Sequence, residues 1–327
     1  MKALLRIILA AAFGVALWLL FALFVPLRPA TQQQSVLLRP GWSSRRIALE
    51  LHNAGVVRSA NAFLLIHYLR VRPLKAGEYL FDRPETTLEV YDRIARGDIY
   101  FHSVVVPEGF NLFDVAGAIE ASGLASRAEF LDQARAALPL ISDLDPQAIS
   151  LEGYLFPDTY RFTRTQSLRD MIATMVRRFR QEQRALNLAG DVHRIVTLAS
   201  IVEKETAVAE ERPQVAGVYA NRLRRNMALD ADPSVIYAAL LAGRYNGAIH
   251  QSDLQSDSPY NTYRYPGLPP GPICNPGRAS LEAALHPAAN DFLYFVSDAQ
   301  GHHRFARTLD EHQRNVAQYR RASSNNR

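Results

Sequence analysis

The first thirty residues carry the feature that most restricts the structure of this chain. The segment MKALLRIILAAAFGVALWLLFALFVPLRPA contains no charged residue from Ile7 to Leu27. A helix of that length, rising about 1.5 Å per residue, crosses the roughly 30 Å hydrocarbon core of a bilayer. We therefore predict a transmembrane helix over residues 7–27, preceded by a short cytoplasmic N-terminus at 1–6.

A cleaved signal peptide is the competing interpretation of this segment. The apolar stretch is longer than the usual apolar region of about 7–15 residues, and no A-x-A cleavage site closes it, which favours an uncleaved anchor. Lys2 and Arg6 precede the span and Arg28 follows it, a weak positive-inside bias. We expect a linker at 28–34 and an extracytoplasmic remainder, periplasmic on the inner (cytoplasmic) membrane of a bacterium.

Charge and cysteine content exclude several other classes. The 327 residues suffice for two or three domains, and 37 basic against 32 acidic residues give a formal charge of +5. No dense Lys/Arg run with interleaved aromatic residues is present, so no nucleic-acid partner is expected. One cysteine, Cys274, excludes an internal disulfide framework. Without C-x-x-C or H-E-x-x-H there is no zinc signature, and neither a metal nor a cofactor is expected.

A pattern of strand, glycine turn, helix, glycine stop and second helix occurs twice. The copies are LLRPGWSSRRIALELHNAGVVRSANAF and VVVPEGFNLFDVAGAIEASGLASRAEF. At an offset of 68 the matched positions are Gly41 and Gly109, Ile47 and Val115, Ala48 and Ala116, Leu51 and Ile119, and Gly55 and Gly123. The pattern by itself indicates no more than a packing unit; a carbohydrate-binding module is the alternative, and it depends on resemblance to a known family.

The intervening sequence completes a small module. It predicts a strand at 77–81 and a helix capped by Thr86 or Thr87, so residues 35–100 can close an α/β unit of their own. Residues 101–149 hold the second copy and lead into a third region, 150–327. There we expect an aromatic edge at 150–162, helices at 167–187 and 191–209, a helix starting near Pro213, and an irregular tyrosine-rich segment at 245–277. The predicted class is α+β.

Two acids in the helix 191–209 raise the question of catalysis. The apolar stripe of this helix is formed by Ile195, Leu198, Ala199, Val202 and Ala209. Glu205 is bordered by apolar neighbours, whereas Glu203 falls on a side compatible with solvent. Desolvation raises the pKa of a carboxyl, which suits a general acid at a glycosidic oxygen. The alternative is a structural Glu205, paired with Arg212 or Arg222.

Other candidate side chains are less specific. Asp230 and Asp232 could supply a second carboxylate, but Asp232 before a proline is typical of a helix cap. Tyr260, Asn261, Tyr263 and Tyr265 offer rings and an amide to a sugar polymer, or else pack a loop. No G-x-S-x-G and no S-x-x-K motif indicates a serine hydrolase or a transpeptidase.

Several long motifs occur in order behind the predicted anchor. They are LEGYLFPDTYRF, ASIVEKETAVAEERPQVAGVYANRL, DADPSVIYA, SPYNTYRYPGLPPGPICNPGRASLEAALHP and FLYFVSD. Together they resemble the endolytic murein transglycosylases, a YceG-like family. The resemblance covers about residues 35 to 320. Departures are small: a glutamine is expected where Asp230 stands, and the loop around Cys274 is expected to be less distinctive.

The resemblance implies a function and a set of residues. It implies a membrane-anchored lytic transglycosylase that cleaves the MurNAc-GlcNAc β-1,4 linkage within peptidoglycan strands, leaves 1,6-anhydro-MurNAc ends and terminates nascent strands. It places the catalytic role on Glu205, the second glutamate of EKET, and substrate binding on Asn261, Tyr263 and Tyr260. It also implies a LysM-like module at 35–100 and penicillin-binding proteins or other cell-wall synthesis machinery as partners. A hydrolytic muramidase and a non-catalytic peptidoglycan-binding scaffold are the alternatives.

Overall fold

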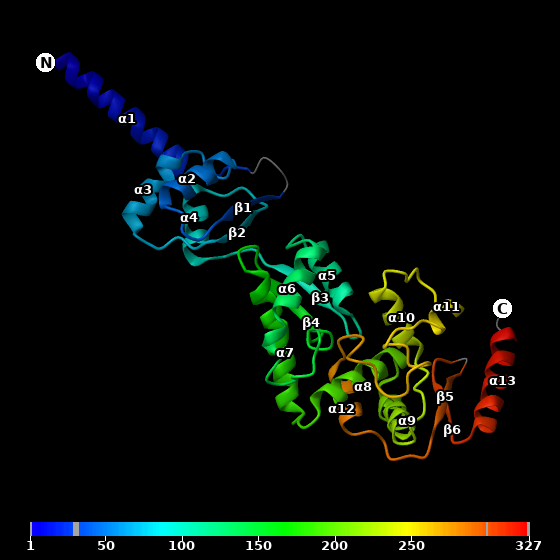
Figure 1. Cartoon of the computed structure of the whole chain (residues 1–327). Helices are drawn as coiled ribbons and strands as arrows, with labels where there is room; N and C mark the ends of the chain where they lie inside the picture. The colour runs from blue at the N-terminus through cyan, green and yellow to red at the C-terminus, as the bar shows by residue number, and fades with distance from the viewer. Residues whose placement is uncertain (1, 29–32, 299, 326–327) are drawn as a thin grey trace. The chain divides into compact units, whose positions relative to one another are not determined.

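The computed structural model describes residues 2–28, 33–298 and 300–325 (Figure 1). It divides into two compact units, one formed by residues 1–103 and 161–167 and the other by 104–160 and 168–327. Helices predominate, and the described strands form three two-stranded sheets. The α+β class predicted from the sequence is confirmed.

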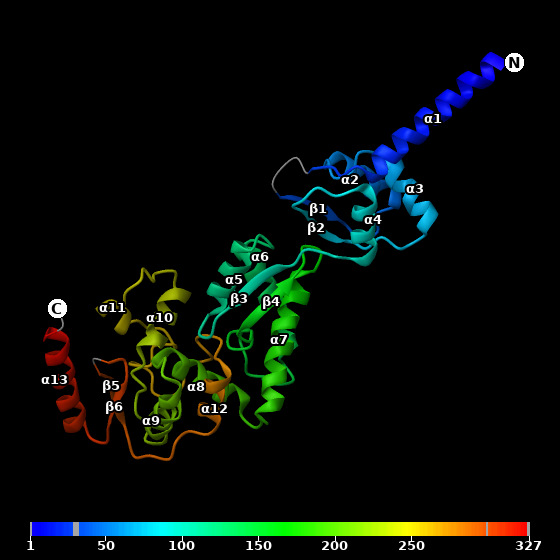
Figure 2. The same cartoon turned by 180° about the vertical axis from the view of Figure 1, so that it is seen from behind.

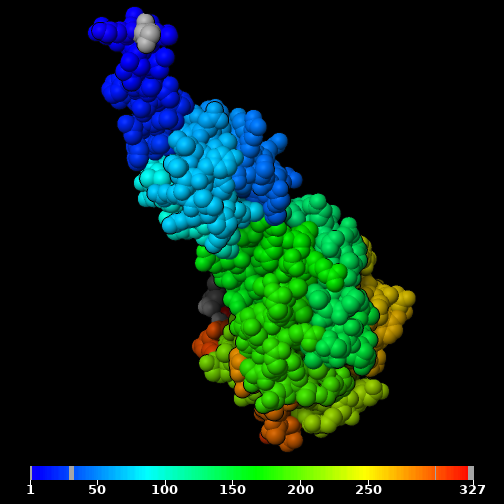
Figure 3. All heavy atoms as spheres, turned by 90° about the vertical axis from the view of Figure 1, so that its left-hand side faces the viewer, coloured from blue at the N-terminus to red at the C-terminus, as the bar shows by residue number. Residues whose placement is uncertain are grey.

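The first unit begins with helix α1, Lys2–Phe24. It is long and apolar enough to cross a membrane, and 6% of its most apolar window is buried by the protein itself. Figure 3 shows α1 standing clear of the module from which it projects. The predicted linker at 28–34 falls largely on residues 29–32, outside the described residues.

The module behind α1 follows the order strand, helix, helix, strand, helix. Its elements are β1 (Gln34–Leu38), α2 (Ser44–Asn53), α3 (Ala60–Arg70), β2 (Gly77–Phe81) and α4 (Thr87–Arg96). β1 and β2 are antiparallel, with Gln34 opposite Phe81. Thr86 caps α4, and Glu89 completes a capping box, so the first of the two predicted caps is the one used. The core includes fully buried Leu38, Leu51, Phe63, Tyr79 and Tyr91.

The predicted repeat is present in the backbone. Its second copy consists of β3 (His102–Val106), α5 (Leu112–Ala121) and α6 (Arg127–Ala136). Gly41 and Gly109 have φ angles of 82° and 80°, and Gly55 and Gly123 both have 70°. These left-handed angles favour glycine at the matched turns, because a Cβ atom is disfavoured there. The chain passes between the two units within β3 and β4 (Asp158–Phe162), which pair.

In the second unit, which carries the long sequence motifs, most elements are helices (Figure 2). After η1 (Leu138–Leu140) its elements are α7 (Leu168–Ala185), α8 (Val192–Glu205), η2 (Ala209–Glu211), α9 (Arg212–Arg224), α10 (Asp232–Leu241), α11 (Gln251–Leu254), α12 (Arg278–Leu285), an antiparallel hairpin of β5 (Tyr294–Ser297) and β6 (His303–Ala306), and α13 (Leu309–Asn325). Helix α8 packs against α12, α9 and α10. Pro213 lies in the first turn of α9, as predicted.

The helix that carries the two acids is shorter than predicted. It ends at Glu205 instead of continuing to residue 209, because Thr206 adopts an extended backbone with φ −137°. The Thr206 hydroxyl accepts a hydrogen bond from the Val208 backbone N–H at 3.0 Å, which stabilises a turn in place of a further helical turn. Glu205 is therefore a helix-terminal residue, and Ala209 is not part of its stripe.

Candidate active site

A pocket of about 360 Å³ in the second unit contains the predicted catalytic acid. It lies where the end of α8, helix α9, the start of α10, the tyrosine-rich loop, strand β5 and helix α13 converge. Its polar lining includes Glu205, Tyr219, Arg222, Asp232, Tyr263 and His312. Segments more than a hundred residues apart thus supply one site around one carboxyl group.

Among the described residues, one side-chain hydrogen bond holds Glu205 in this pocket, and Tyr219 of α9 donates it to Oε1 at 2.8 Å. Tyr219 itself is 2% exposed. Burial raises the pKa of the Glu205 carboxyl to about 7, and the charge of Asp232 adds to the rise. The Tyr219 hydrogen bond and the Arg222 charge oppose it by favouring the carboxylate. Near neutral pH this acid can therefore both donate and accept a proton.

Glu203 differs from Glu205 in its partners, not in its burial. Its side chain is 6% exposed, so the predicted solvent-compatible position is wrong. Its carboxylate accepts hydrogen bonds from Arg212 at 3.2 Å and from the Gly277 backbone N–H at 2.9 Å. Arg212 also lies 3.6 Å from Glu108. Glu203 therefore links α8 to α9 and to the segment before α12, which is a structural role.

Arg222 lines the same pocket and joins several of its segments through hydrogen bonds. Its guanidinium donates to the backbone carbonyls of Leu293 at 2.6 Å and of Ala228 and Leu229 at 3.0 Å each, and to the Asp230 carboxylate at 2.9 Å. The proposed pairing of Glu205 with Arg212 or Arg222 is therefore wrong, because each arginine is paired with another acid. Arg222 acts on Glu205 only through its charge.

Asp232 is the first residue of α10 and does not cap it. Ala231 occupies the capping position and makes no side-chain cap. The Asp232 carboxylate instead accepts a hydrogen bond from the Tyr263 hydroxyl at 2.6 Å. Asp230, the residue expected to be a glutamine in the family, has a left-handed φ of 51° and pairs with Arg222. The cap prediction for Asp232 is wrong because a turn geometry alone does not reveal a tertiary partner.

The three residues predicted to bind substrate lie in different surroundings. Tyr263 is 40% exposed and lines the pocket. Asn261 is fully buried, and its side-chain amide donates to the carbonyls of Leu254 and Ser256 at 2.9 Å each. Tyr260 is 6% exposed and packs on Tyr237, with 5.0 Å between ring centroids. Asn261 and Tyr260 organise the loop that presents Tyr263.

Sequence reasoning missed the contribution of the C-terminal helix. His312 on α13 lines the pocket and stacks on Tyr294, with ring centroids 5.2 Å apart and an angle of 22° between the planes. Its Nδ1 atom is buried and has no hydrogen-bond partner among the described residues. Burial and the positive charge of Arg222 both lower the pKa of His312, so a neutral imidazole faces the pocket. No local pattern in the sequence links residue 312 to residue 205.

The neighbouring histidines of the β5–β6 hairpin have structural partners. His302 and His303 both contact Glu211, at 3.1 Å and 2.7 Å from their Nδ1 atoms. Within the part of the chain that the structure describes, no three His, Cys, Asp or Glu side chains gather to hold a metal ion. Cys274 is buried, and its thiol contacts the Ser200 carbonyl at 3.2 Å.

Comparison with known proteins agrees with the motifs. A Bacillus subtilis (strain 168) protein named endolytic murein transglycosylase is 34% identical over 302 residues, covering 85% of this chain and 82% of that protein. A Streptococcus pneumoniae (strain D39) protein of the same name is 29% identical over 316 residues, covering 85% of this chain and 57% of that protein. A crystal structure of a yceG-like protein from Listeria monocytogenes has a TM-score of 0.58 at 32% identity and covers 86% of this chain and 98% of that one. The YceG-like family model matches residues 36–318, and the chain belongs to that family.

Proposed function

We propose that this protein is a membrane-anchored endolytic murein transglycosylase that uses Glu205 as its catalytic acid and base. Its substrate is then the MurNAc-GlcNAc β-1,4 linkage within a peptidoglycan strand. The observation that carries the proposal is a buried carboxyl with a pKa of about 7, without an ion-pair partner among the described residues, inside a polar and aromatic pocket. The names of the relatives support the substrate class.

In the first half of the reaction, protonated Glu205 gives its proton to the bridging oxygen. The bond from this oxygen to C1 of the muramic residue breaks, and positive charge develops at C1 and the ring oxygen. The released strand leaves with a new hydroxyl group that carries the Glu205 proton. The Tyr219 hydroxyl, 2.8 Å from Oε1, stabilises the carboxylate that this step creates.

In the second half, the Glu205 carboxylate takes a proton from the C6 hydroxyl of the same muramic residue. The C6 oxygen attacks C1 and closes a 1,6-anhydro ring, which returns Glu205 to its protonated form. No water is consumed, and the substrate supplies its own nucleophile at a high effective concentration. One carboxyl suffices for both proton transfers, which fits a pocket in which Asp232 and Asp230 are engaged by Tyr263 and Arg222.

Tyr263 is the side chain that we assign to direct contact with the glycan. Its ring is partly exposed at the pocket, and its hydroxyl is fixed by Asp232. For Asn261 and Tyr260 we propose an indirect role, because both are buried in the loop. His312 adds a neutral polar ring across the pocket, able to hydrogen-bond a hydroxyl or acetamido group.

Two substitutions should move the alkaline limit of activity in opposite directions. The general acid is active when protonated, so kcat/KM should fall as pH rises through about 7. Tyr219→Phe removes a hydrogen bond that favours the carboxylate, which raises the pKa of Glu205 and shifts the limit to higher pH. Asp232→Asn removes a neighbouring negative charge, which lowers that pKa and shifts the limit to lower pH. Initial rates on purified glycan strands between pH 5 and 9 measure both shifts.

The two variants are expected to shift the alkaline limit in opposite directions, which a general loss of structure cannot do. A variant that only loosens the pocket admits water to Glu205 and lowers its pKa, so general damage in both variants would shift the limit in the same direction, to lower pH. Glu210→Gln, an exposed acid five residues beyond Glu205, serves as the matched control and should leave the profile as in the wild type. Shifts of the same sign in Tyr219→Phe and Asp232→Asn would contradict the assignment of the titrating group.

Product analysis separates the proposed reaction from its rivals. Mass spectrometry of digested strands should detect anhydro ends, each one water lighter than a reducing end. Reducing ends would instead establish a hydrolytic muramidase, and intact strands after incubation with wild type would support a non-catalytic scaffold. Attack by the C6 hydroxyl and attack by water use the same carboxyl, so the mass of the new chain end identifies the nucleophile.

We further infer that α1 anchors the protein in the cytoplasmic membrane, with both units on the extracytoplasmic side. The support is the apolar composition of α1 and the bias of Lys2 and Arg6 to its N-terminal side. Proteolysis of sealed spheroplasts should remove a C-terminal tag and spare an N-terminal one. Partnership with penicillin-binding proteins rests on the family resemblance and stays a prediction.

The LysM-like function of residues 35–100 has a candidate surface. A pocket of about 660 Å³ is lined by β1 and α2 and includes Trp42, with the Arg46 guanidinium 5.1 Å from the ring centroid. An aromatic face beside polar groups suits a sugar polymer. Trp42→Ala should weaken sedimentation with insoluble peptidoglycan by about tenfold, equivalent to about 1.4 kcal/mol. Tyr68→Ala, an exposed aromatic residue of the same module outside this pocket, should sediment like wild type.

A further inference from the structure

The last turn of α1 is built into the module that follows it. Ala22 is 1% exposed, and its carbonyl accepts a hydrogen bond from the Thr87 hydroxyl at 2.7 Å. Leu23 packs against the core of the module, and Leu27 pairs with Glu85 through two backbone hydrogen bonds. The helix and the module are therefore one folded body at this junction.

This docking leaves just enough helix for a bilayer. The part of α1 before Phe21, Lys2–Leu20, has about 19 residues, which span roughly 28 Å at 1.5 Å per residue. Its charge-free part begins only at Ile7, so the long side chains of Lys2 and Arg6 must extend to the headgroups on the opposite side. The hydrocarbon core is about 30 Å thick. If α1 spans the membrane, as proposed above, then its docked end lies at the lipid surface, and the module must lie directly against the headgroups.

Helix α3 starts at this same junction. The Arg58 guanidinium, just before α3, donates to the Pro26 carbonyl at 3.1 Å and lies over the Phe21 ring at 4.5 Å from its centroid. Figures 1 and 2 show α3 running crosswise to α1. A helix that crosses the anchor at the level of the lipid surface lies along that surface.

The far end of α3 exposes an apolar cluster, here called the α3 tip. It consists of Leu65, Tyr68, Leu69 and Val71, exposed by 38%, 71%, 76% and 79%. Val71 ends the helix in a left-handed conformation with φ 49°. Apolar side chains gathered at one exposed helix end indicate a binding surface, unlike single exposed ones. Tyrosine is a residue enriched at membrane interfaces.

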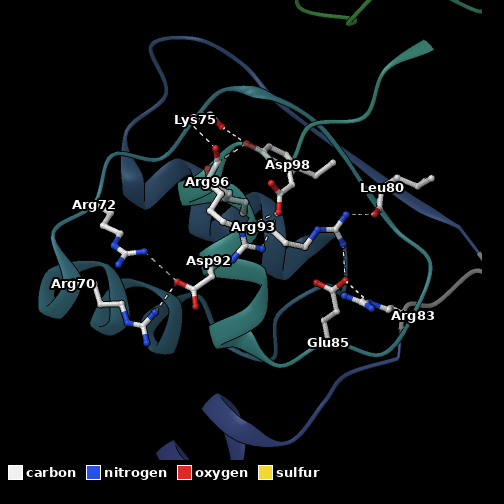
Figure 4. A network of polar contacts seen from close by, with 12 residues as sticks. Arg70, Arg72, Lys75, Leu80, Arg83, Glu85, Asp92, Arg93, Arg96 and Asp98 are labelled. Atoms are coloured by element: carbon white, nitrogen blue, oxygen red, sulfur yellow. Dashed lines mark hydrogen bonds and ion pairs between the residues drawn. The ribbon is translucent and has the colours of Figure 1, made fainter. Parts of the chain in front are cut away.

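Two arginines flank the α3 tip. Arg70 lies 2.6 Å and Arg72 3.9 Å from Asp92 of α4 (Figure 4). Their side chains remain 38% and 59% exposed, so the guanidinium groups can also meet lipid phosphates. Apolar residues beside cations are the composition of a segment that lies in the headgroup layer of an anionic membrane.

We propose that the α3 tip inserts into the headgroup layer of the membrane that α1 spans, as a second lipid contact beside the anchor. Two contacts on one folded body fix the module against tilting and rotation about the axis of α1. This inference rests on the proposed anchoring by α1.

Site-specific fluorescence in lipid nanodiscs tests the proposal on the full chain. Single thiols at Leu69→Cys in the tip, Leu9→Cys in α1 and Tyr100→Cys would carry nitrobenzoxadiazole; Cys274 is fully buried and does not compete in the folded protein. Tyr100 is a matched exposed aromatic control, because it lies in the segment that leads from α4 into β3 and its backbone N–H bonds to the Glu78 carbonyl of β2, not to α1 or α3. Acyl-chain-brominated phosphatidylcholine with phosphatidylglycerol is the quencher.

We expect bromine to quench the Leu9 and Leu69 probes at least about twofold more than the Tyr100 probe, as burial in lipid requires. Quenching at Leu9 with Leu69 equal to Tyr100 would overturn the second contact and leave the anchor intact. Absence of quenching at Leu9 would overturn both proposals. A Leu69 emission shift that depends on protein concentration and not on brominated lipid would overturn the proposal in favour of contact with a second copy of the chain.

Discussion

Glu205→Gln should abolish cleavage of glycan strands while the protein stays folded. Glutamine keeps the size of the side chain and can still accept the Tyr219 hydrogen bond, but it can neither donate the proton to the bridging oxygen nor take the one from C6. Loss of general acid-base catalysis costs about 10²- to 10⁴-fold, and one residue performing both steps places the loss toward the upper end. Single-turnover rates on purified strands measure it.

Comparison with Glu203→Gln makes this test specific. Glu203 has stronger hydrogen-bond partners than Glu205, because its carboxylate accepts from the Arg212 guanidinium and from the Gly277 backbone N–H. Its replacement should lower thermal stability, since the buried Arg212 guanidinium loses the nearer of its two acidic partners and keeps only Glu108 at 3.6 Å. The folded fraction of Glu203→Gln should still yield anhydro products. Loss of cleavage by folded Glu203→Gln together with retained cleavage in Glu205→Gln would overturn the catalytic assignment.

Arg222→Leu should cause the largest loss of stability in the second unit. Arg222 is 8% exposed and donates four hydrogen bonds that join α9, the turn at 228–230 and the segment entering β5. Leucine leaves three backbone carbonyls and Asp230 without this donor. Buried acceptors left unpaired cost about 1–3 kcal/mol each, and partial rehydration places the net loss at about 3 kcal/mol. Calorimetry should therefore show a lower transition temperature for this unit.

Two further variants locate the source of that loss. Arg225→Leu, an exposed arginine at the end of the same helix, should leave the transition nearly unchanged. Arg222→Lys keeps the charge but lacks the planar fork, so its stability should lie between those of wild type and Arg222→Leu. Equal losses in Arg222→Leu and Arg225→Leu would show that helix composition, and not the hydrogen-bond fork, is responsible.

Local sequence predicted those features that depend on neighbouring residues. The charge-free run predicted the long apolar helix α1, although the helix covers Lys2–Phe24 and not 7–27. The two glycine pairs marked turns that require left-handed backbone, and Thr86 and Thr87 were the two candidates for the cap that begins α4. Each of these depends on hydrophobicity, steric freedom or a hydrogen bond within a few residues. The order of long motifs was likewise enough to identify the family.

The Thr206 turn marks where this local reasoning failed. Helical periodicity continues past residue 205, yet the Thr206 hydroxyl binds the Val208 N–H and the helix ends. Asp232 was likewise predicted to cap a helix, but its carboxylate accepts a hydrogen bond from Tyr263, which lies in a loop some thirty residues further along the chain. In each case a competing hydrogen bond, not propensity, decided the outcome.

By itself, the sequence determined that one of two nearby glutamates could act as an acid, and helical phase favoured Glu205. Tertiary structure decided how the two carboxylates are compensated. Both side chains are largely removed from water, but Arg212 and the Gly277 N–H compensate Glu203, whereas Tyr219 gives Glu205 one neutral hydrogen bond. A carboxylate loses hydration wherever it is buried, and only an opposite charge or several donors can replace it. Arg212, Gly277 and Tyr219, which set the surroundings of the two carboxylates, come from other segments of the chain. The periodicity of the helix that carries the two acids does not reveal them.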